Sequence, residues 1–98
     1  MTLQQLTDNI KTRVATAESL NATAKLVTDQ GVVFIDSRQQ PATVSNDDQP
    51  ADTELHVDVA DLERMATGDL NPMMAFMTGK LKVKGDMAVA MKMGQVMG

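Results

Sequence analysis

The sequence has no cysteine, tryptophan or tyrosine, and Phe34 and Phe76 are its only phenylalanines. Without cysteine there is no disulfide framework, no thiolate nucleophile and no cysteine-ligated zinc or iron–sulfur site. With so few rings, the chain also lacks the exposed aromatic platform on which single-stranded nucleic acids stack. We therefore expect a domain without these chemistries, whose core is filled by aliphatic side chains.

Long apolar runs are missing as well. No stretch of eighteen apolar residues occurs, as a membrane-spanning helix would require. The polar residues Gln4, Gln5, Asp8, Lys11 and Arg13 leave no apolar core for a signal peptide at the start of the chain. We therefore expect a soluble, cytoplasmic protein.

Positive charge is scarce in the first seventy residues. Residues 1–70 carry 5 basic and 12 acidic side chains (−7), whereas residues 71–98 carry 4 and 1 (+3), which together give −4. This acidic excess argues against nucleic-acid binding, because that binding is driven by neutralising phosphates. The length of 98 residues predicts a single domain spanning 1–98.

Methionine is abundant instead, and eight of the nine methionines lie between Met65 and Met97. The unbranched, polarizable side chain adapts to apolar shapes of different length and is frequent at promiscuous binding surfaces. Methionine can equally fill a core that is poor in aromatic residues. Taken by themselves, the residues favour this second interpretation.

Hydrophobic periodicity predicts four helices and five strands. We expect the helices at Thr2 to about Ala17, from Asp58 or Val59 to a stop at Gly68, at Met73–Met77 after the Asn71-Pro72 start, and at Met87 to about Met97. We expect the strands at Asn21–Asp29, Val32–Ile35, Ala42–Ser45, Thr53–Asp58 and Lys80–Lys84. The first two should form a hairpin whose second strand is the more deeply buried, and the third should be an edge strand.

The last predicted helix is apolar around most of its circumference. Between Met87 and Met97 only Lys92 and Gln95 are polar side chains. An apolar surface that wide exceeds what one packing face needs in a small domain, so we expect a further apolar contact there. The domain could therefore be an interaction or homodimerisation module that docks through this helix.

His56 is the only histidine and alternates with acidic residues in its predicted strand. It could act as a base or a metal ligand, but no second histidine, cysteine or nucleophile motif accompanies it. We therefore expect a solvated strand residue, no metal site and no catalytic residue. The neighbouring acidic residues lack the regular spacing and turn glycine of a calcium loop, and we expect a solvated face for Asp47, Asp48, Asp52, Glu54, Asp58, Asp61 and Glu63.

One segment resembles a known family over a helix, a strand, a turn and a second helix. Its residues are Asn71-Pro72-x-x-Ala75-Phe76-Met77-x-Gly79-Lys80-Leu81-Lys82-Val83-Lys84-Gly85-Asp86-Met87-x-x-Ala90-Met91-Lys92, preceded by Asp61-Leu62 and Thr67-Gly68-Asp69-Leu70. This pattern is similar to the sterol carrier protein 2 (SCP2) sterol-binding domain family, as a free-standing small bacterial-type member. It departs from the family at Ala88-Val89 and Met93, where Gly-Leu and Leu are frequent.

The resemblance implies an α+β fold with a five-stranded, twisted, mostly antiparallel sheet. Helices would cover one face of this sheet and enclose an apolar tunnel. Family members bind sterols, fatty acids, fatty acyl-CoA esters or phospholipids without catalysing a reaction, and they need no cofactor. Related domains assist ubiquinone biosynthesis, which makes such an accessory role an alternative alongside the interaction module.

On this basis we expect a non-catalytic lipid carrier with a methionine-rich tunnel, whose last helix acts as a gate. Its partners would be a hydrophobic small molecule and transiently an anionic membrane surface, with the protein a monomer or weak dimer. The tunnel residues expected to contact the ligand are Phe34, Leu55, Val57, Leu62, Met65, Met74, Phe76, Met77, Leu81, Val83, Met87, Val89 and Met91.

Lys80, Lys82 and Lys84 form one face of the strand that this family motif contains. They could bind acyl-CoA phosphates or an anionic membrane surface. They could also protect an edge strand against pairing with another chain, because lysine is a common device for that purpose. Of the two interpretations, the sequence favours edge protection.

Overall fold

The computed structural model describes residues 1–17 and 19–97, with side chains as far as residue 93. The predicted apolar side chains of Val96 and Met97 and the chain end at Gly98 therefore lie outside the described part. The elements follow in the order α1 (Leu3–Ala15), β1 (Thr23–Thr28), β2 (Gly31–Asp36), β3 (Thr43–Ser45), β4 (Thr53–Val57), α2 (Val59–Ala66), α3 (Pro72–Met77), β5 (Leu81–Gly85) and α4 (Met87–Met97).

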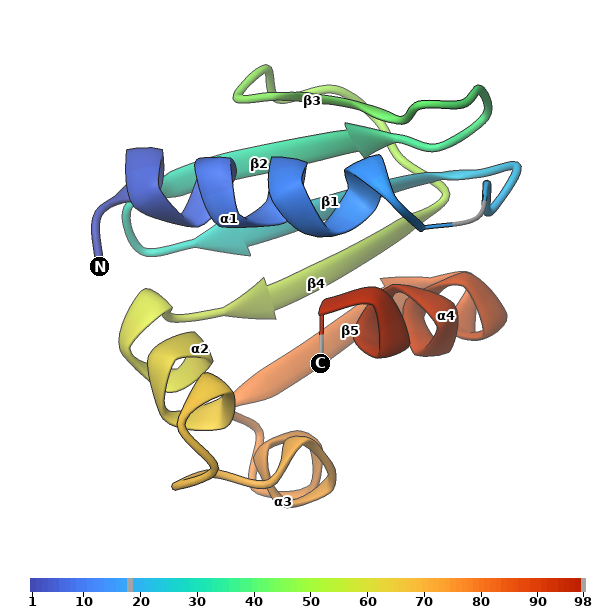
Figure 1. Cartoon of the computed structure of the whole chain (residues 1–98). Helices are drawn as coiled ribbons and strands as arrows, with labels where there is room; N and C mark the ends of the chain where they lie inside the picture. Colours follow the sequence, from blue (N-terminus) through green and yellow to red (C-terminus); the bar gives the residue numbers. More distant parts are fainter. Residues whose placement is uncertain (18, 98) are drawn as a thin grey trace.

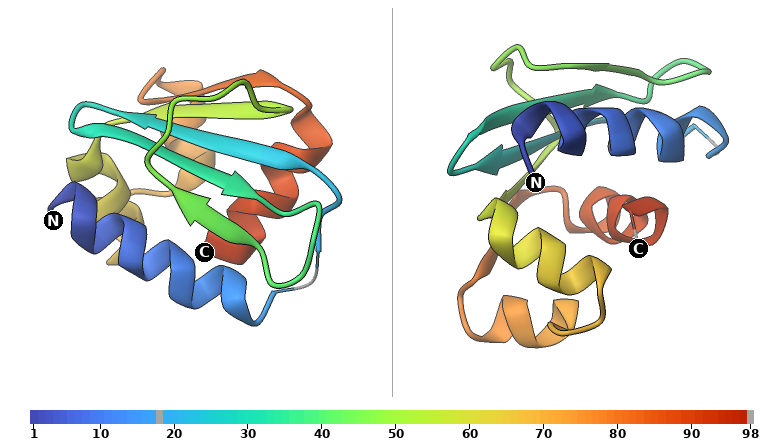
Figure 2. Two further views of the ribbon diagram at one scale, coloured as in Figure 1. Left: turned by 90° about the horizontal axis from the view of Figure 1, so that it is seen from above. Right: turned by 60° about the vertical axis from the view of Figure 1, so that its left-hand side comes forward.

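The five strands form one twisted sheet in the order β3-β2-β1-β4-β5 (Figure 1). Three neighbouring pairs are antiparallel, and β1 and β4 are parallel. The α+β fold with a mostly antiparallel sheet is therefore confirmed. The four helices lie on one side of the sheet, with α2 and α3 further from it than α1 and α4 (Figure 2).

Most predicted elements occur where periodicity placed them, and side chains cap the starts of three helices. Thr2 and Gln5 form a reciprocal capping box at the start of α1. The Asn71 side chain accepts a hydrogen bond from the Met73 N–H at the start of α3. The Asp86 carboxylate accepts from the N–H groups of Ala88 and Val89 at the start of α4.

The two strands of the hairpin are both well buried, and the deepest side chains lie on the second strand, as predicted. Leu26 on β1 is 1% exposed, and Val33 and Ile35 on β2 are 0% exposed. Each strand has a neighbour on both sides, because β1 also pairs with β4 and β2 also pairs with β3. Strand β2 contributes Val33 and Ile35 to the same core.

The core lies between the sheet and the helices. The buried apolar cluster consists of Leu6, Ile10, Val14, Ala24, Leu26, Val33, Ile35, Leu55, Val57, Val59, Ala90 and Met93. Met93 is 1% exposed, so one of the C-terminal methionines fills the core as an ordinary apolar residue. Helix α4 therefore packs through this side and turns its other side outward.

The connection between β3 and β4 passes over the opposite face of the sheet (Figure 2). Lys25 on β1 lies under it and donates a hydrogen bond from Nζ to the Asp48 carboxylate at 2.8 Å. This hydrogen bond raises the pKa of Lys25, so the buried ammonium group stays charged. The Thr23 N–H also donates to the Asp52 carboxylate at 2.9 Å, which fixes the end of the connection.

Candidate ligand-binding cavity

A cavity of about 480 Å³ lies between the sheet and the helices. This volume is within the range of small-molecule sites, which is about 300–1,000 Å³. Its wall contains two polar residues, Asn9 and Arg13, and is otherwise apolar. The apolar lining residues are Met1, Leu6, Ile10, Leu26, Leu55, Val57, Leu62, Met65, Ala66, Pro72, Leu81 and Met91.

Three adjacent strands supply the floor of the cavity. Leu26 on β1 lies beside Leu55 on β4, and Val57 on β4 lies opposite Leu81 on β5. Because side chains alternate along a strand, these four point to the same face of the sheet, the one that the helices cover. The alternation seen in the sequence around Leu55 and Val57 therefore produces this part of the site.

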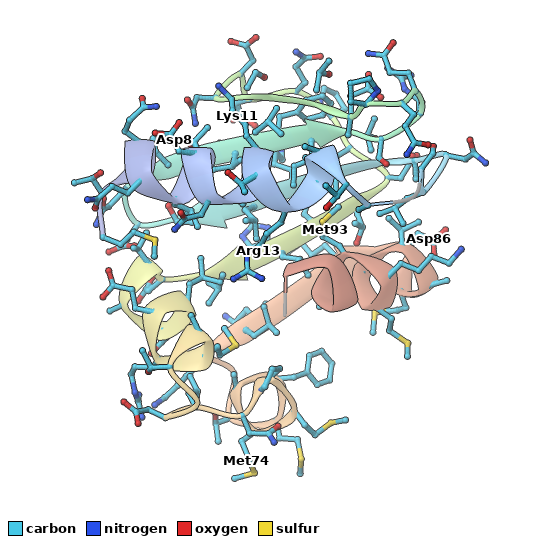
Figure 3. The ribbon with its side chains drawn as sticks, viewed as in Figure 1. Asp8, Lys11, Arg13, Met74, Asp86 and Met93 are labelled. Atoms are coloured by element: carbon cyan, nitrogen blue, oxygen red, sulfur yellow. The ribbon has the colours of Figure 1, made fainter. Side chains whose placement is uncertain are left out.

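Helix α1 supplies one wall. Leu6 and Ile10 are four residues apart and lie on one side of the helix, where both belong to the core cluster. Asn9 and Arg13 have the same spacing and bring polar groups to the cavity. Arg13 extends from α1 toward the lower helices, whereas Asp8 and Lys11 extend the other way (Figure 3).

Helix α2 supplies a second wall with Leu62, Met65 and Ala66. Its first N–H, on Val59, donates to the Asp29 carboxylate at 2.9 Å, which anchors α2 to the turn between β1 and β2. Leu62 and Met65 are only partly buried, because the cavity lies where a packing partner would otherwise be. The site is thus a space in the core with flexible apolar sides.

Six of the predicted ligand contacts line this cavity. They come from the sheet and from α2 and α4, and they are Leu55, Val57, Leu62, Met65, Leu81 and Met91. Met91 is also largely exposed, which places it at the rim rather than in the interior.

The other seven predicted contacts lie elsewhere. Phe34 is buried but pairs with Lys25, so it lies on the face of the sheet away from the helices. Val83 and Val89 are half-buried outside the lining. The remaining four are exposed on α3 and α4, namely Met74, Phe76, Met77 and Met87. Met74 points away from the sheet at the outer end of the molecule (Figure 3).

The three predicted lysine positions are all exposed. Lys82 lies opposite His56 and Lys84 opposite Glu54, on the face away from the helices. Strand β5 is an edge of the sheet, as the lysine alternation predicted. Lys80 lies between α3 and β5 and forms a backbone hydrogen bond to Ala75.

Sequence reasoning missed the contribution of α1 to the cavity. The spacing of Leu6 and Ile10 did identify an apolar helix face, but it gave no indication of which apolar residues meet a cavity and which meet the sheet. Nothing in the sequence indicated that Asn9 and Arg13 line a cavity, because polar residues are ordinary on a surface helix.

His56 lies where a solvated strand residue is expected. It is half-buried, and its Nε2 is 3.1 Å from the Glu54 carboxylate. Within residues 1–17 and 19–97, no group of three or more acidic or histidine side chains is arranged to hold a metal ion. Among these described residues, no helix is long and apolar enough to cross a membrane.

Solved structures of similar architecture include two sterol carrier proteins and a segment of a sec-alkyl sulfatase. Sterol carrier protein 2 like 2 from Aedes aegypti superposes with a TM-score of 0.74 and 22% identity, over 96% of this chain and 94% of that one. Sterol carrier protein 2 from Yarrowia lipolytica gives 0.67 and 19%, over 95% and 77%. A segment of the sec-alkyl sulfatase PisA1 gives 0.79 and 16%, over 98% of this chain and 16% of that one. At these identities the likeness shows the fold alone.

Sequence relatives are closer. Hydroxysteroid dehydrogenase-like protein 2 from Danio rerio is 39% identical over 69 residues, and the human protein of that name is 38% identical over 71 residues. These matches cover 68% and 70% of this chain but 17% of each relative, so the chain spans about a sixth of their length. The model of the SCP-2 sterol transfer family matches residues 3–98. The chain therefore belongs to the SCP-2 sterol transfer family.

Proposed function

We propose that this domain is a non-catalytic lipid carrier, and that its cavity holds the hydrocarbon part of one amphipathic ligand. The observation that carries the proposal is the apolar cavity of about 480 Å³ between the sheet and the helices. A polar ligand would leave its hydrogen bonds unmade against Leu55, Val57 and Leu62, whereas an acyl chain loses none. Each methylene group moved from water into the cavity contributes about 0.8 kcal/mol.

The wall also supports a range of ligand shapes. Met65 and Met91 are unbranched and have three rotatable bonds, so they can follow chains of different length with little strain. Met65 is half-buried and Met91 is exposed, so neither side chain is enclosed on all sides. We therefore propose a carrier that accepts several related lipids rather than one.

The Arg13 side chain in the cavity wall favours a ligand with a carboxylate head group. A guanidinium group binds a carboxylate through two parallel hydrogen bonds, which makes Arg13 suited to a fatty acid. Asn9 lies one turn before it and can donate from its side-chain amide. We propose a fatty acid, or an acyl chain with an anionic head, ahead of a sterol, whose single hydroxyl would use only part of this pair.

The test is the displacement of a fluorescent fatty acid from two matched variants. Met65→Trp puts a large ring into the cavity, while Met74→Trp puts the same ring on the exposed surface of α3. We expect the first variant to bind the probe at least about tenfold more weakly and the second to bind as the wild type does, since only the first removes ligand volume. Equal binding by both variants, or no binding by the wild type, would contradict the proposal.

The proposal concerns this domain only. Because the chain spans about a sixth of the hydroxysteroid dehydrogenase-like relatives, their dehydrogenase chemistry is not assigned to it. An accessory role in ubiquinone biosynthesis remains a second proposal, and a prenyl chain would use the same apolar wall. Replacing Arg13 distinguishes the two, because the binding of a prenyl quinone precursor without a carboxylate would not depend on that side chain.

A further inference from the structure

Three methionines line the cavity, and they differ in their access to water. They are Met1, Met65 and Met91. Met65 on α2 is half-buried and Met1 is 38% exposed, whereas Met91 on α4 is 67% exposed. Met91 therefore belongs both to the wall of the cavity and to the surface of the molecule. A reagent dissolved in water reaches its side chain without opening the fold.

The thioether of methionine is the only sulfur group of this chain, because the sequence has no cysteine. Hydrogen peroxide oxidises an accessible thioether to a sulfoxide. The sulfur atom supplies an electron pair and forms a bond to one peroxide oxygen, the O–O bond breaks, and the second oxygen leaves as water. The sulfur is oxidised by two electrons and the peroxide is reduced, so the step needs no other reactant.

Oxidation of Met91 would change the wall that a hydrocarbon chain contacts. The sulfoxide is polar and accepts hydrogen bonds, whereas the thioether is apolar. If the oxidised side chain stays against the ligand, its S=O group loses hydrogen bonds to water. If the side chain turns outward, the ligand loses an apolar contact at the rim. Either position of the side chain weakens binding of an acyl chain.

We propose that Met91 is an oxidation site that regulates the cavity, so that hydrogen peroxide lowers the affinity for acyl chains. The proposal rests on the carrier function and adds the regulation of the same cavity. A methionine sulfoxide reductase reverses the change, because two thiols form a disulfide while the sulfoxide oxygen leaves as water. Regulation is therefore reversible.

Two other methionines serve as internal references for Met91. Met93 lies two residues further along α4, is 1% exposed and extends toward the sheet (Figure 3). Met74 on α3 is exposed and points away from the sheet, and it does not line the cavity. We expect peroxide to reach Met74 and Met91 before Met93, and only the oxidation of Met91 to alter ligand binding.

Peptide mass spectrometry of the folded protein measures the order of oxidation. Trypsin cleaves after Lys92, so Met91 and Met93 fall on separate peptides. Fragment ions then distinguish Met91 from Met87, which shares its peptide. We expect the sulfoxide to form at least about tenfold faster at Met91 than at Met93. Treatment is stopped before Met93 is oxidised, so that the core stays intact.

Displacement of a fluorescent fatty acid measures the effect on binding in the wild type, Met91→Leu and the matched control Met74→Leu. Leucine keeps a similar apolar volume and has no sulfur. Each protein is compared with its own untreated form. After peroxide we expect about fivefold weaker binding by the wild type and by Met74→Leu, and a change within about twofold for Met91→Leu. Reductases for both sulfoxide epimers, supplied with dithiothreitol, should restore the lost affinity.

Several results would overturn the regulation. If the wild type carries the sulfoxide at Met91 and binds the fatty acid as before, the proposal fails and the carrier function stands. An equal loss in Met91→Leu would assign the effect to another methionine of the wall. Equal rates at Met91 and Met93 would contradict the difference in access on which the proposal depends. If the untreated wild type binds no fatty acid, the carrier function fails and the regulation fails with it.

Discussion

In the proposed carrier function, Arg13 is the residue that distinguishes one ligand class from another. Apolar side chains around the cavity accept any hydrocarbon, so they contribute affinity without identifying the head of the ligand. Arg13 carries a permanent charge in the same wall and points toward the lower helices, away from Lys11 (Figure 3). The preference for carboxylates should therefore depend on this side chain and not on the net charge of the protein.

Replacing Arg13 with glutamine should weaken the binding of a long-chain fatty acid about tenfold while leaving the matching fatty alcohol unchanged. The physical reason is the loss of a charge-assisted hydrogen bond to the carboxylate, which is worth about 1.5–3 kcal/mol and is partly screened at this exposed position. Competition against a fluorescent fatty acid measures both affinities.

Lys11→Gln serves as the control for Arg13→Gln, because it removes the same charge from the other side of α1. It should leave both affinities unchanged. A parallel loss for the acid and the alcohol in Arg13→Gln would assign Arg13 a packing role and remove the argument for a carboxylate.

Individual site residues were predictable only where the alternation of apolar and polar residues showed which side of the sheet each one faces. Leu55 and Val57 alternate with polar residues, so their position facing the helices follows from the sequence. Phe34 lies within the continuous apolar run Val32–Ile35, where alternation gives no face, and it points away from the helices. Met74 and Met77 were assigned to the cavity from their chemistry alone, and that chemistry does not distinguish a cavity wall from an exposed surface.

Gly85 lies at the junction of β5 and α4 and determines how these two elements are connected. It ends β5 with a φ of 94°, lies opposite Thr53 and is followed by the Asp86 N–H, which donates to the Asp52 carbonyl at 2.9 Å. A Cβ atom at position 85 would collide with the same Asp52 carbonyl oxygen. The direction in which α4 leaves the sheet thus depends on a residue without a side chain.

Gly85→Ala should destabilise the protein more than Gly79→Ala. Both glycines have positive φ, which costs alanine about 1–2 kcal/mol, but a Cβ at position 79 meets no atom within 4 Å. The additional loss of stability in Gly85→Ala therefore measures the cost of the collision with the Asp52 backbone, which must shift. Urea denaturation of the two variants measures the difference, and equal losses would show that the chain absorbs the collision at no cost.

Local patterns in the sequence were sufficient to locate the helices and strands. They did not indicate which distant strands pair with each other. The caps at Thr2 and Asn71 and the strict alternation around β5 specified where helices and strands lie. Nothing local specifies that β1 and β4, separated by β2 and β3, pair in parallel. This pairing makes β1 the central strand of the sheet.

The whole molecule keeps a space between its layers that its own side chains do not fill. Protein interiors are normally packed as densely as organic crystals, whereas this chain of 98 residues leaves an apolar cavity of about 480 Å³ between its layers. Among its methionines, two groups have different surroundings. Met65 and Met91 line the cavity, and Met73, Met74 and Met77 lie outside it.

This division allows one experiment to locate the ligand. With 13C-labelled methionine methyl groups, an NMR titration with palmitate in the absence of vesicles reports on both groups of methionines at once. The carrier account predicts that the Met65 and Met91 methyl signals shift and show contacts to the acyl chain, while those of Met74 and Met77 stay in place. Shifts confined to Met74 and Met77, or no shifts at all, would contradict a ligand held between the sheet and the helices.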